Sequence, residues 1–109
     1  MELVRQWLIA FLLTVAIEAP IVTLLLRGPL RRRIPLAVVA QLASHPVVWF
    51  VFFALPLRYT TALVLSESWA VLSEATIYAL LGDAVSWRRA LGVSLVANSA
   101  SYLASFLLR

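Results

Sequence analysis

The sequence has no cysteine and no lysine, only one histidine and only three glycines. Without cysteine, the chain has no disulfides, thiolate metal sites or thiol nucleophiles. One histidine and no Gly-rich phosphate loop exclude zinc fingers, paired-histidine metal motifs and the common nucleotide-binding motifs. Charged residues are also scarce, at 13% of 109 residues, against about 25% in soluble domains. The composition is therefore not that of an ordinary soluble domain.

Apolar residues are abundant, at 63% of the chain. A chain this short cannot bury so much apolar surface within itself, whereas each membrane-spanning helix takes about 20 mostly apolar residues. Four apolar runs have this length, at about 7–26, 34–55, 61–81 and 87–108. We therefore predict one all-α membrane domain over residues 1–109, with four transmembrane helices in an antiparallel bundle joined by short loops.

Residues that end or begin helices separate these runs. The first three runs stop near Gly28, Pro56 and Gly82, residue types that terminate helices for conformational reasons. Ser86 is a good N-cap for the last run. The first run is too long for a signal peptide and lacks a favourable cleavage site, so we expect a retained first helix.

The nine basic residues are all arginine, and most lie in two of the connections. Six lie in the connections 27–33 and 82–89: Arg27, Arg31, Arg32, Arg33, Arg88 and Arg89. Only Arg5, Arg58 and Arg109 lie on the opposite side. Because cytoplasmic loops hold the excess of positive charge, we expect both connections in the cytoplasm and both termini outside it, in the plasma (inner) membrane. Arginines that mark membrane boundaries also argue against a nucleic-acid partner.

Strongly polar side chains also occur inside the apolar runs, at Glu18, His45, Glu67, Glu74 and Asn98. Counted from the arginine-rich side, about 9 residues precede Glu18, Glu74 and Asn98, and about 12 precede His45. At 1.5 Å per residue these depths are roughly 13 to 18 Å, near the middle of a core roughly 30 Å thick. We expect these four groups at one level. Glu67 is deeper, and we expect it to pair with Arg58 or lipid headgroups.

The fourth run carries a stripe of small polar residues, Ser94, Asn98, Ser101 and Ser105, at steps of four, three and four. Such stripes let membrane helices approach closely and form hydrogen bonds, so we expect this face to contact a second copy or another membrane subunit. In the third run two glutamates, at about +2.5 to +3.5 kcal/mol each, cancel the insertion energy of its eight Leu, Ile and Val residues. That helix therefore needs partners, neutral carboxyls, a cation or a water-filled cavity.

Ionisable residues inside a membrane usually serve function because they are costly. The predicted ion- or proton-binding residues are Glu18, His45, Glu74 and Glu67. Asn98, Ser101, Ser94 and Thr14 are predicted to orient a substrate or to form helix–helix hydrogen bonds. Burial favours neutral carboxyls and a neutral imidazole, so a Glu–His–Glu group can exchange protons near neutral pH. The alternative is that the same groups only join helices by hydrogen bonds. No Glu-x-x-His spacing is present, and we predict no metal or cofactor.

Three functions fit these features. The first is a small proton- or cation-coupled carrier or channel-like protein in the lipid bilayer. The second is a structural or accessory subunit of a larger membrane complex, whose polar residues select its helix partners. The third is an intramembrane enzyme that uses one carboxyl as acid and another as base on a lipid-like substrate. The sequence favours a protein without enzymatic activity, as a homo-oligomer or with other membrane subunits.

In size and layout the chain is similar to the small multidrug resistance transporters, which also have four short helices and a glutamate in the first. Glu18 occupies that place here. The likeness is one of architecture. Ala19-Pro20 replaces that family's pattern after the glutamate, the third run has two glutamates that the family does not require, and a His45-Pro46 pair is foreign to it.

Overall fold

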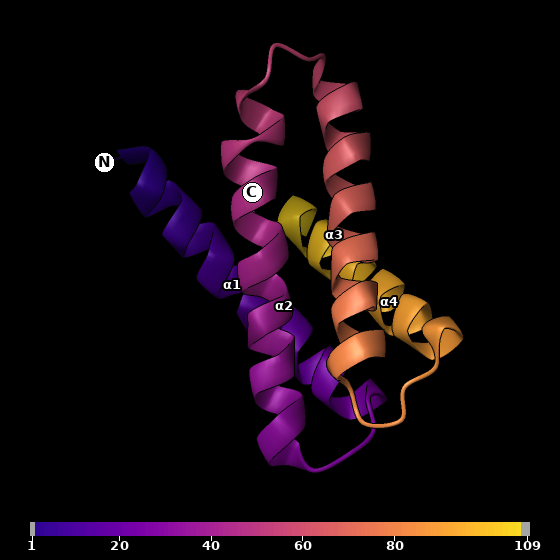
Figure 1. The fold of residues 1–109 in the computed structure, drawn as a ribbon. Helices are drawn as coiled ribbons and strands as arrows, with labels where there is room; N and C mark the ends of the chain where they lie inside the picture. Colours follow the sequence, from indigo (N-terminus) through magenta and orange to yellow (C-terminus); the bar gives the residue numbers. More distant parts are fainter. Residues whose placement is uncertain (1, 108–109) are drawn as a thin grey trace.

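The computed structural model describes residues 2–107 and consists of four helices (Figure 1). They are α1 (Glu2–Leu25), α2 (Leu30–Phe50), α3 (Tyr59–Leu81) and α4 (Trp87–Leu107), with a short 3₁₀ helix, η1 (Phe52–Ala54), after α2. No strand occurs between residues 2 and 107. The prediction of an all-α four-helix bundle is therefore confirmed over this range. Residues 108 and 109, which the sequence analysis included, lie outside it.

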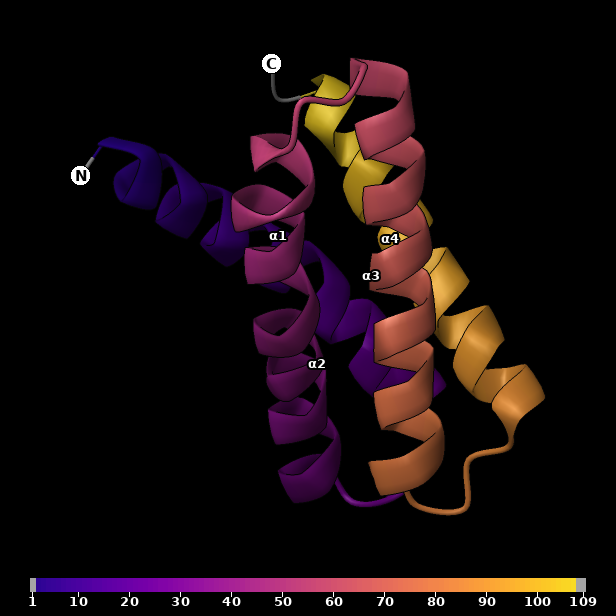
Figure 2. The ribbon, with the colours of Figure 1, turned by 45° about the horizontal axis from the view of Figure 1, so that its top comes forward.

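Each helix packs beside the next, and α4 packs back against α1. Consecutive helices run in opposite directions through connections at 26–29, 51–58 and 82–86 (Figures 1 and 2). Two of these connections share one end of the bundle with the six clustered arginines, and we call it the arginine-rich end. The 51–58 connection lies at the opposite, arginine-poor end. The N-terminal half of α1 diverges from the other helices towards that end.

The second helix differs most from its predicted bounds, because it begins at Leu30 and ends at Phe50 rather than covering 34–55. Pro29 has an extended backbone immediately before the helix, so the three arginines that follow are helical and not part of a loop. At the other end, the backbone N–H of Val51 donates to the Val47 carbonyl before the 3₁₀ turn begins. A count of apolar residues fails at both ends, because helices continue into polar residues and stop within apolar ones.

By length and composition, two segments are suited to crossing a membrane: α1, Glu2–Leu25, and the stretch Leu30–Ala54. α3 and α4 are not among them. α3 carries two glutamates, and α4 carries an asparagine and several serines. The structure thus supports two of the four predicted spans, and membrane crossing by the other two helices stays a prediction.

Two arginines from elsewhere in the chain complete the C-terminal end of α1, whose own last turn has no basic residue. The Arg89 side chain donates to the Leu25 carbonyl from Nε at 3.0 Å and from Nη2 at 2.6 Å. Arg33 Nη1 donates to the carbonyls of Thr23 and Leu26. Because the last carbonyls of a helix have no intrahelical donor, these contacts fasten α1 to the beginnings of α2 and α4.

We expect Arg89→Gln to lower the free energy of unfolding by about 1 kcal/mol, the usual value of a cation at a helix C-terminus. Arg88→Gln is the matched control, since Arg88 is exposed, one position away, and has no hydrogen bond or ion pair in the described part of the chain. Thermal unfolding in detergent, followed by circular dichroism, measures both. Equal effects of the two substitutions would contradict the role of Arg89 at the end of α1.

Buried apolar residues gather on one side of the bundle, between its middle and the arginine-rich end. We call this group the arginine-side core: Val22, Leu26, Ala37, Ala40, Ala75, Tyr78, Val85, Ala90, Val93 and Ala97. Alanines dominate it, and they let the four helices approach closely. This half of the bundle is consequently packed with apolar side chains, whereas the buried groups towards the other end are polar.

Candidate functional site

Polar and apolar residues are placed in the reverse of their usual arrangement in a soluble domain. The buried polar side chains come from all four helices: Glu18, Gln41, Ser44, Ser66, Glu74, Ser94 and Asn98. Large apolar side chains lie on the outside, and Leu24, Leu72 and Leu103 are each at least 60% exposed. Charged residues are almost never fully buried in soluble proteins unless they are paired. The polar interior therefore requires an account of each hydrogen bond.

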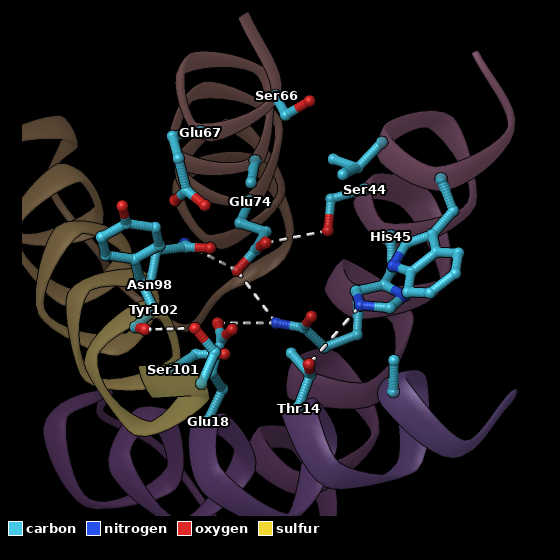
Figure 3. Close-up of a pocket in the computed structure, with 16 residues that line it drawn as sticks. Thr14, Glu18, Ser44, His45, Ser66, Glu67, Glu74, Asn98, Ser101 and Tyr102 are labelled. Atoms are coloured by element: carbon cyan, nitrogen blue, oxygen red, sulfur yellow. Dashed lines mark hydrogen bonds between the residues drawn. The ribbon is translucent and has the colours of Figure 1, made fainter. Parts of the chain in front are cut away.

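Gln41 lies at the centre of this interior and joins two carboxyl groups (Figure 3). Its Nε2 atom donates to Glu18 Oε1 at 2.8 Å and to Glu74 Oε1 at 3.1 Å. The Gln41 side chain is 1% exposed, and those of Glu18 and Glu74 are 2% and 0% exposed. A primary amide has two N–H donors, so both are used by the two carboxyls. α2 is thereby tied to α1 and to α3 at one level.

Further donors meet the same two carboxyls. Ser44 Oγ donates to Glu74 Oε2 at 2.8 Å, and Asn98 Nδ2 donates to Glu74 Oε1 at 3.2 Å. Ser101 hydrogen-bonds the Glu18 carboxyl, and the two carboxyls also contact each other. The structure thus brings together Glu18, Glu74 and Asn98, as their depths along the chain predicted. We call these six side chains, with Gln41, the carboxyl network.

The serine stripe of α4 is buried against the same chain. Asn98 Nδ2 also donates to the Ser94 carbonyl at 2.8 Å, and Ser94 Oγ donates to the Val71 carbonyl of α3 at 2.8 Å. Ser101 and Ser105 are half-buried and face the interior. The sequence analysis expected this face to contact a second copy or another subunit. In the structure it is occupied within one chain, because the bundle's own polar groups need these partners.

His45 does not lie between the two glutamates, so the predicted Glu–His–Glu group is not formed. Its Nε2 atom lies 3.4 Å from Thr14 Oγ1, and its ring centroid lies 5.7 to 6.4 Å from those of Trp7, Phe11 and Trp49. The Nδ1 atom is buried and has no hydrogen-bond partner between residues 2 and 107. His45 is one helical turn beyond Gln41, towards the arginine-poor end.

Glu67 lies on the same side of the bundle as His45 and is half-buried. The expected pair with Arg58 is absent, since the described residues show no ion pair or hydrogen bond to the Glu67 carboxyl. Instead the carboxyl points into the interior, on the open side of Glu74 (Figure 3). Glu67 is therefore the carboxyl of the group that is left without a donor.

A cavity of about 240 Å³ connects these groups. It is lined by Ala10, Thr14, Glu18, Gln41, Ser44, His45, Val48, Trp49, Ser66, Glu67, Ala70, Glu74, Asn98, Ser101, Tyr102 and Ser105. The Ser66 hydroxyl is buried on this lining and has no hydrogen-bond partner in the part of the chain that the structure describes. Since buried hydroxyls are nearly always paired, that hydroxyl indicates a polar occupant of the cavity.

The arrangement does not form a metal centre in the described part of the chain. Between residues 2 and 107, no three His, Asp or Glu side chains are grouped closely enough to hold a metal ion. The oxygens of Glu18 and Glu74 already accept hydrogen bonds from Gln41, Ser44, Asn98 and Ser101. What the network offers chemically is a pair of buried carboxyls surrounded by neutral donors.

Compared with known proteins, the chain matches no protein-family model, no curated protein sequence and no solved structure. The geometry of the network and the cavity therefore carries the functional argument.

Proposed function

We propose that the chain is a four-span membrane protein that exchanges protons for a small cation at the Glu18–Glu74 pair, as a carrier or channel-like protein. The observation that carries the proposal is the contact between two fully buried carboxyls, both held by Gln41, at the inner end of a polar cavity. The function belongs to this pair because the remaining polar groups are neutral donors arranged around it.

The apolar exterior supports a membrane location. Leu, Ile, Val and Phe side chains are exposed along all four helices, and contiguous apolar surface of this extent is unfavourable in water. Intramembrane glutamates face the interior of their bundle or a water-filled cavity, as Glu18 and Glu74 do. The excess of arginine at one end favours the cytoplasm for that end.

The chemistry follows from the closeness of the two carboxyls. Two carboxylates in contact cannot both be charged in a medium of low polarity, so such a pair holds a proton between them. Release of this proton leaves a negative charge that a small cation can balance. Gln41 and Asn98 stay neutral throughout and keep both carboxyls in place. A proton and a cation would thus compete for one site.

The test is cation-driven proton movement in vesicles that contain the purified protein and an internal pH-sensitive dye. An imposed sodium or potassium gradient should change the internal pH with the unaltered protein. Glu74→Gln should reduce this rate at least about tenfold, because an amide cannot release a proton at neutral pH. Glu2→Gln is the control, since Glu2 is exposed at the start of α1. Flux that persists in Glu74→Gln, or that does not exceed the flux of protein-free vesicles, would refute the proposal.

A second candidate is a structural or accessory subunit. The hydrogen bonds favour it, because Glu18 and Glu74 receive donors from three helices of their own chain and need no ligand for pairing. In that case the unaltered protein gives no flux in vesicles, and Glu74→Gln disrupts co-purification with a membrane partner instead. The flux measurement with unaltered protein separates the two candidates.

A further inference from the structure

We propose that the cavity is a water-filled vestibule open only at the arginine-poor end, and that Glu67 is the carboxylate in it that first receives a small hydrated cation. The inference rests on the proposed function for the fate of the cation, at Glu18 and Glu74. The direction of access and the role of Glu67 stand on the geometry of the bundle, and they are tested without any measurement of flux.

The two halves of the bundle differ in what fills them. On the arginine-rich side of Gln41 and Glu74 lies the arginine-side core, whose ten apolar residues are each at most 9% exposed. On the other side the same four helices line the cavity, from Glu74 outwards to Ser105. α1 diverges from the bundle on that side (Figures 1 and 2). Water can therefore reach the network from the arginine-poor end, and the apolar packing blocks it from the other.

The contents of the cavity indicate water and positive charge. Its volume of about 240 Å³ has room for several waters, at about 30 Å³ each. Two polar atoms on it lack a partner between residues 2 and 107: Ser66 Oγ and His45 Nδ1. No arginine lines it within the described residues, whereas three glutamates do. Apolar cavities stay empty, but cavities with unpaired polar groups hold water.

Among the three glutamates, Glu67 is the one free to bind. Glu74 accepts three hydrogen bonds and Glu18 accepts from Gln41 and Ser101, while Glu67 has none in the described chain and faces the cavity (Figure 3). It also lies seven residues before Glu74, two turns nearer the arginine-poor end on the same face of α3. A cation entering from that end meets Glu67 before the carboxyl pair.

The experiment uses the absence of cysteine, because each introduced thiol is then the only one. Ser105→Cys and, as a second variant, Ser66→Cys place a thiol in the vestibule. Ser94→Cys is the matched control, a buried serine of the same helix outside the cavity. Ser86→Cys marks the arginine-rich end, where it is exposed. Vesicle-embedded protein is treated from one face at a time with a membrane-impermeant thiol reagent, the trimethylammonioethyl or the sulfonatoethyl methanethiosulfonate.

We expect Ser105→Cys and Ser66→Cys to react only from the face opposite to Ser86→Cys, and Ser94→Cys to react from neither. A cleft lined by one sign of charge raises the rate of an oppositely charged reagent by tenfold or more. The cationic reagent should thus react about tenfold faster than the anionic one, and Glu67→Gln should bring this ratio close to one.

Three results would overturn the inference: thiols at 105 and 66 that react from the arginine-rich face, thiols at both positions that react from neither face, or a charge ratio that Glu67→Gln leaves unchanged. One-sided labelling together with a Glu74→Gln variant of normal flux refutes the proposed function alone. Flux that depends on Glu74, with labelling from both faces, refutes the vestibule alone.

Discussion

Replacing Gln41 with leucine will lower the free energy of unfolding by roughly 3 kcal/mol. Its amide is the donor that Glu18 and Glu74 share, and leucine fills the same space without one. Hydrogen bonds between membrane helices are worth about 0.6 kcal/mol on average and up to about 1.7. Two bonds near the upper value are lost here. Two carboxyls are then left in contact with one donor fewer each, which adds to the cost.

Graded controls isolate this effect. Ser44→Ala removes one donor to Glu74 and should cost about 1 kcal/mol. Leu42→Ala, next to Gln41 but exposed, should cost less in detergent. Glu18→Gln in the Gln41→Leu background restores a donor and removes one carboxyl, so part of the lost stability should return. If Gln41→Leu unfolds at the same temperature as Ser44→Ala, the bridging role of Gln41 is wrong.

Gly82→Ala will destabilise the bundle by about 3 kcal/mol, the upper range for an overpacked site. Gly82 directly follows α3, and its N–H donates to the Tyr78 carbonyl at 2.9 Å. A Cβ atom at this position would collide with that carbonyl oxygen and lie 2.7 Å from Val85 Cγ2. Backbone oxygen cannot move aside as a flexible side chain does. The last turn of α3 would shift, and Tyr78 and Val85 of the arginine-side core would shift with it.

Gly92→Ala is the internal control for this substitution. A Cβ atom at Gly92 meets no heavy atom within 4 Å, and the position is in the interior of α4. Alanine there should stabilise the helix by about 0.5 to 1 kcal/mol, because glycine loses more backbone entropy on folding. Thermal unfolding in one detergent should therefore give shifts of opposite sign for the two variants. A loss at Gly92 as large as that at Gly82 would show that the detergent-solubilised helices respond to composition and not to contacts.

The depth of a residue along its helix predicted much of the network but not its bridging group. Glu18, Glu74 and Asn98 lie about nine residues from the arginines or from Asp83, and the structure brings all three together. Gln41 lies about eight residues from Arg33, at the same level, and the sequence analysis passed over it because it is uncharged. Counting all hydrogen-bonding side chains at that level, and not only ionisable ones, would have found it.

His45 shows what depth cannot predict. Its count of about twelve residues already placed it one turn beyond the others, and the structure keeps it there. Its neighbours Trp7 and Phe11 depend on how α1 crosses α2, which is a property of the whole bundle and not of spacing within one helix. The same holds for Glu67, whose expected partner Arg58 was chosen from sequence distance, whereas the fold turns the carboxyl inward.

The grip of Arg33 and Arg89 on the end of α1 bears on the order in which the chain assembles. A helical hairpin of α1 and α2 can form early, because Arg33 lies only seven residues from Leu26, whose carbonyl it holds. The Leu25 carbonyl waits for Arg89, 64 residues later, and contacts between distant residues form only after the intervening loop has closed. During synthesis the first helix therefore stays incompletely fastened until the fourth arrives. A chain truncated before α4 should leave α1 exposed to membrane proteases.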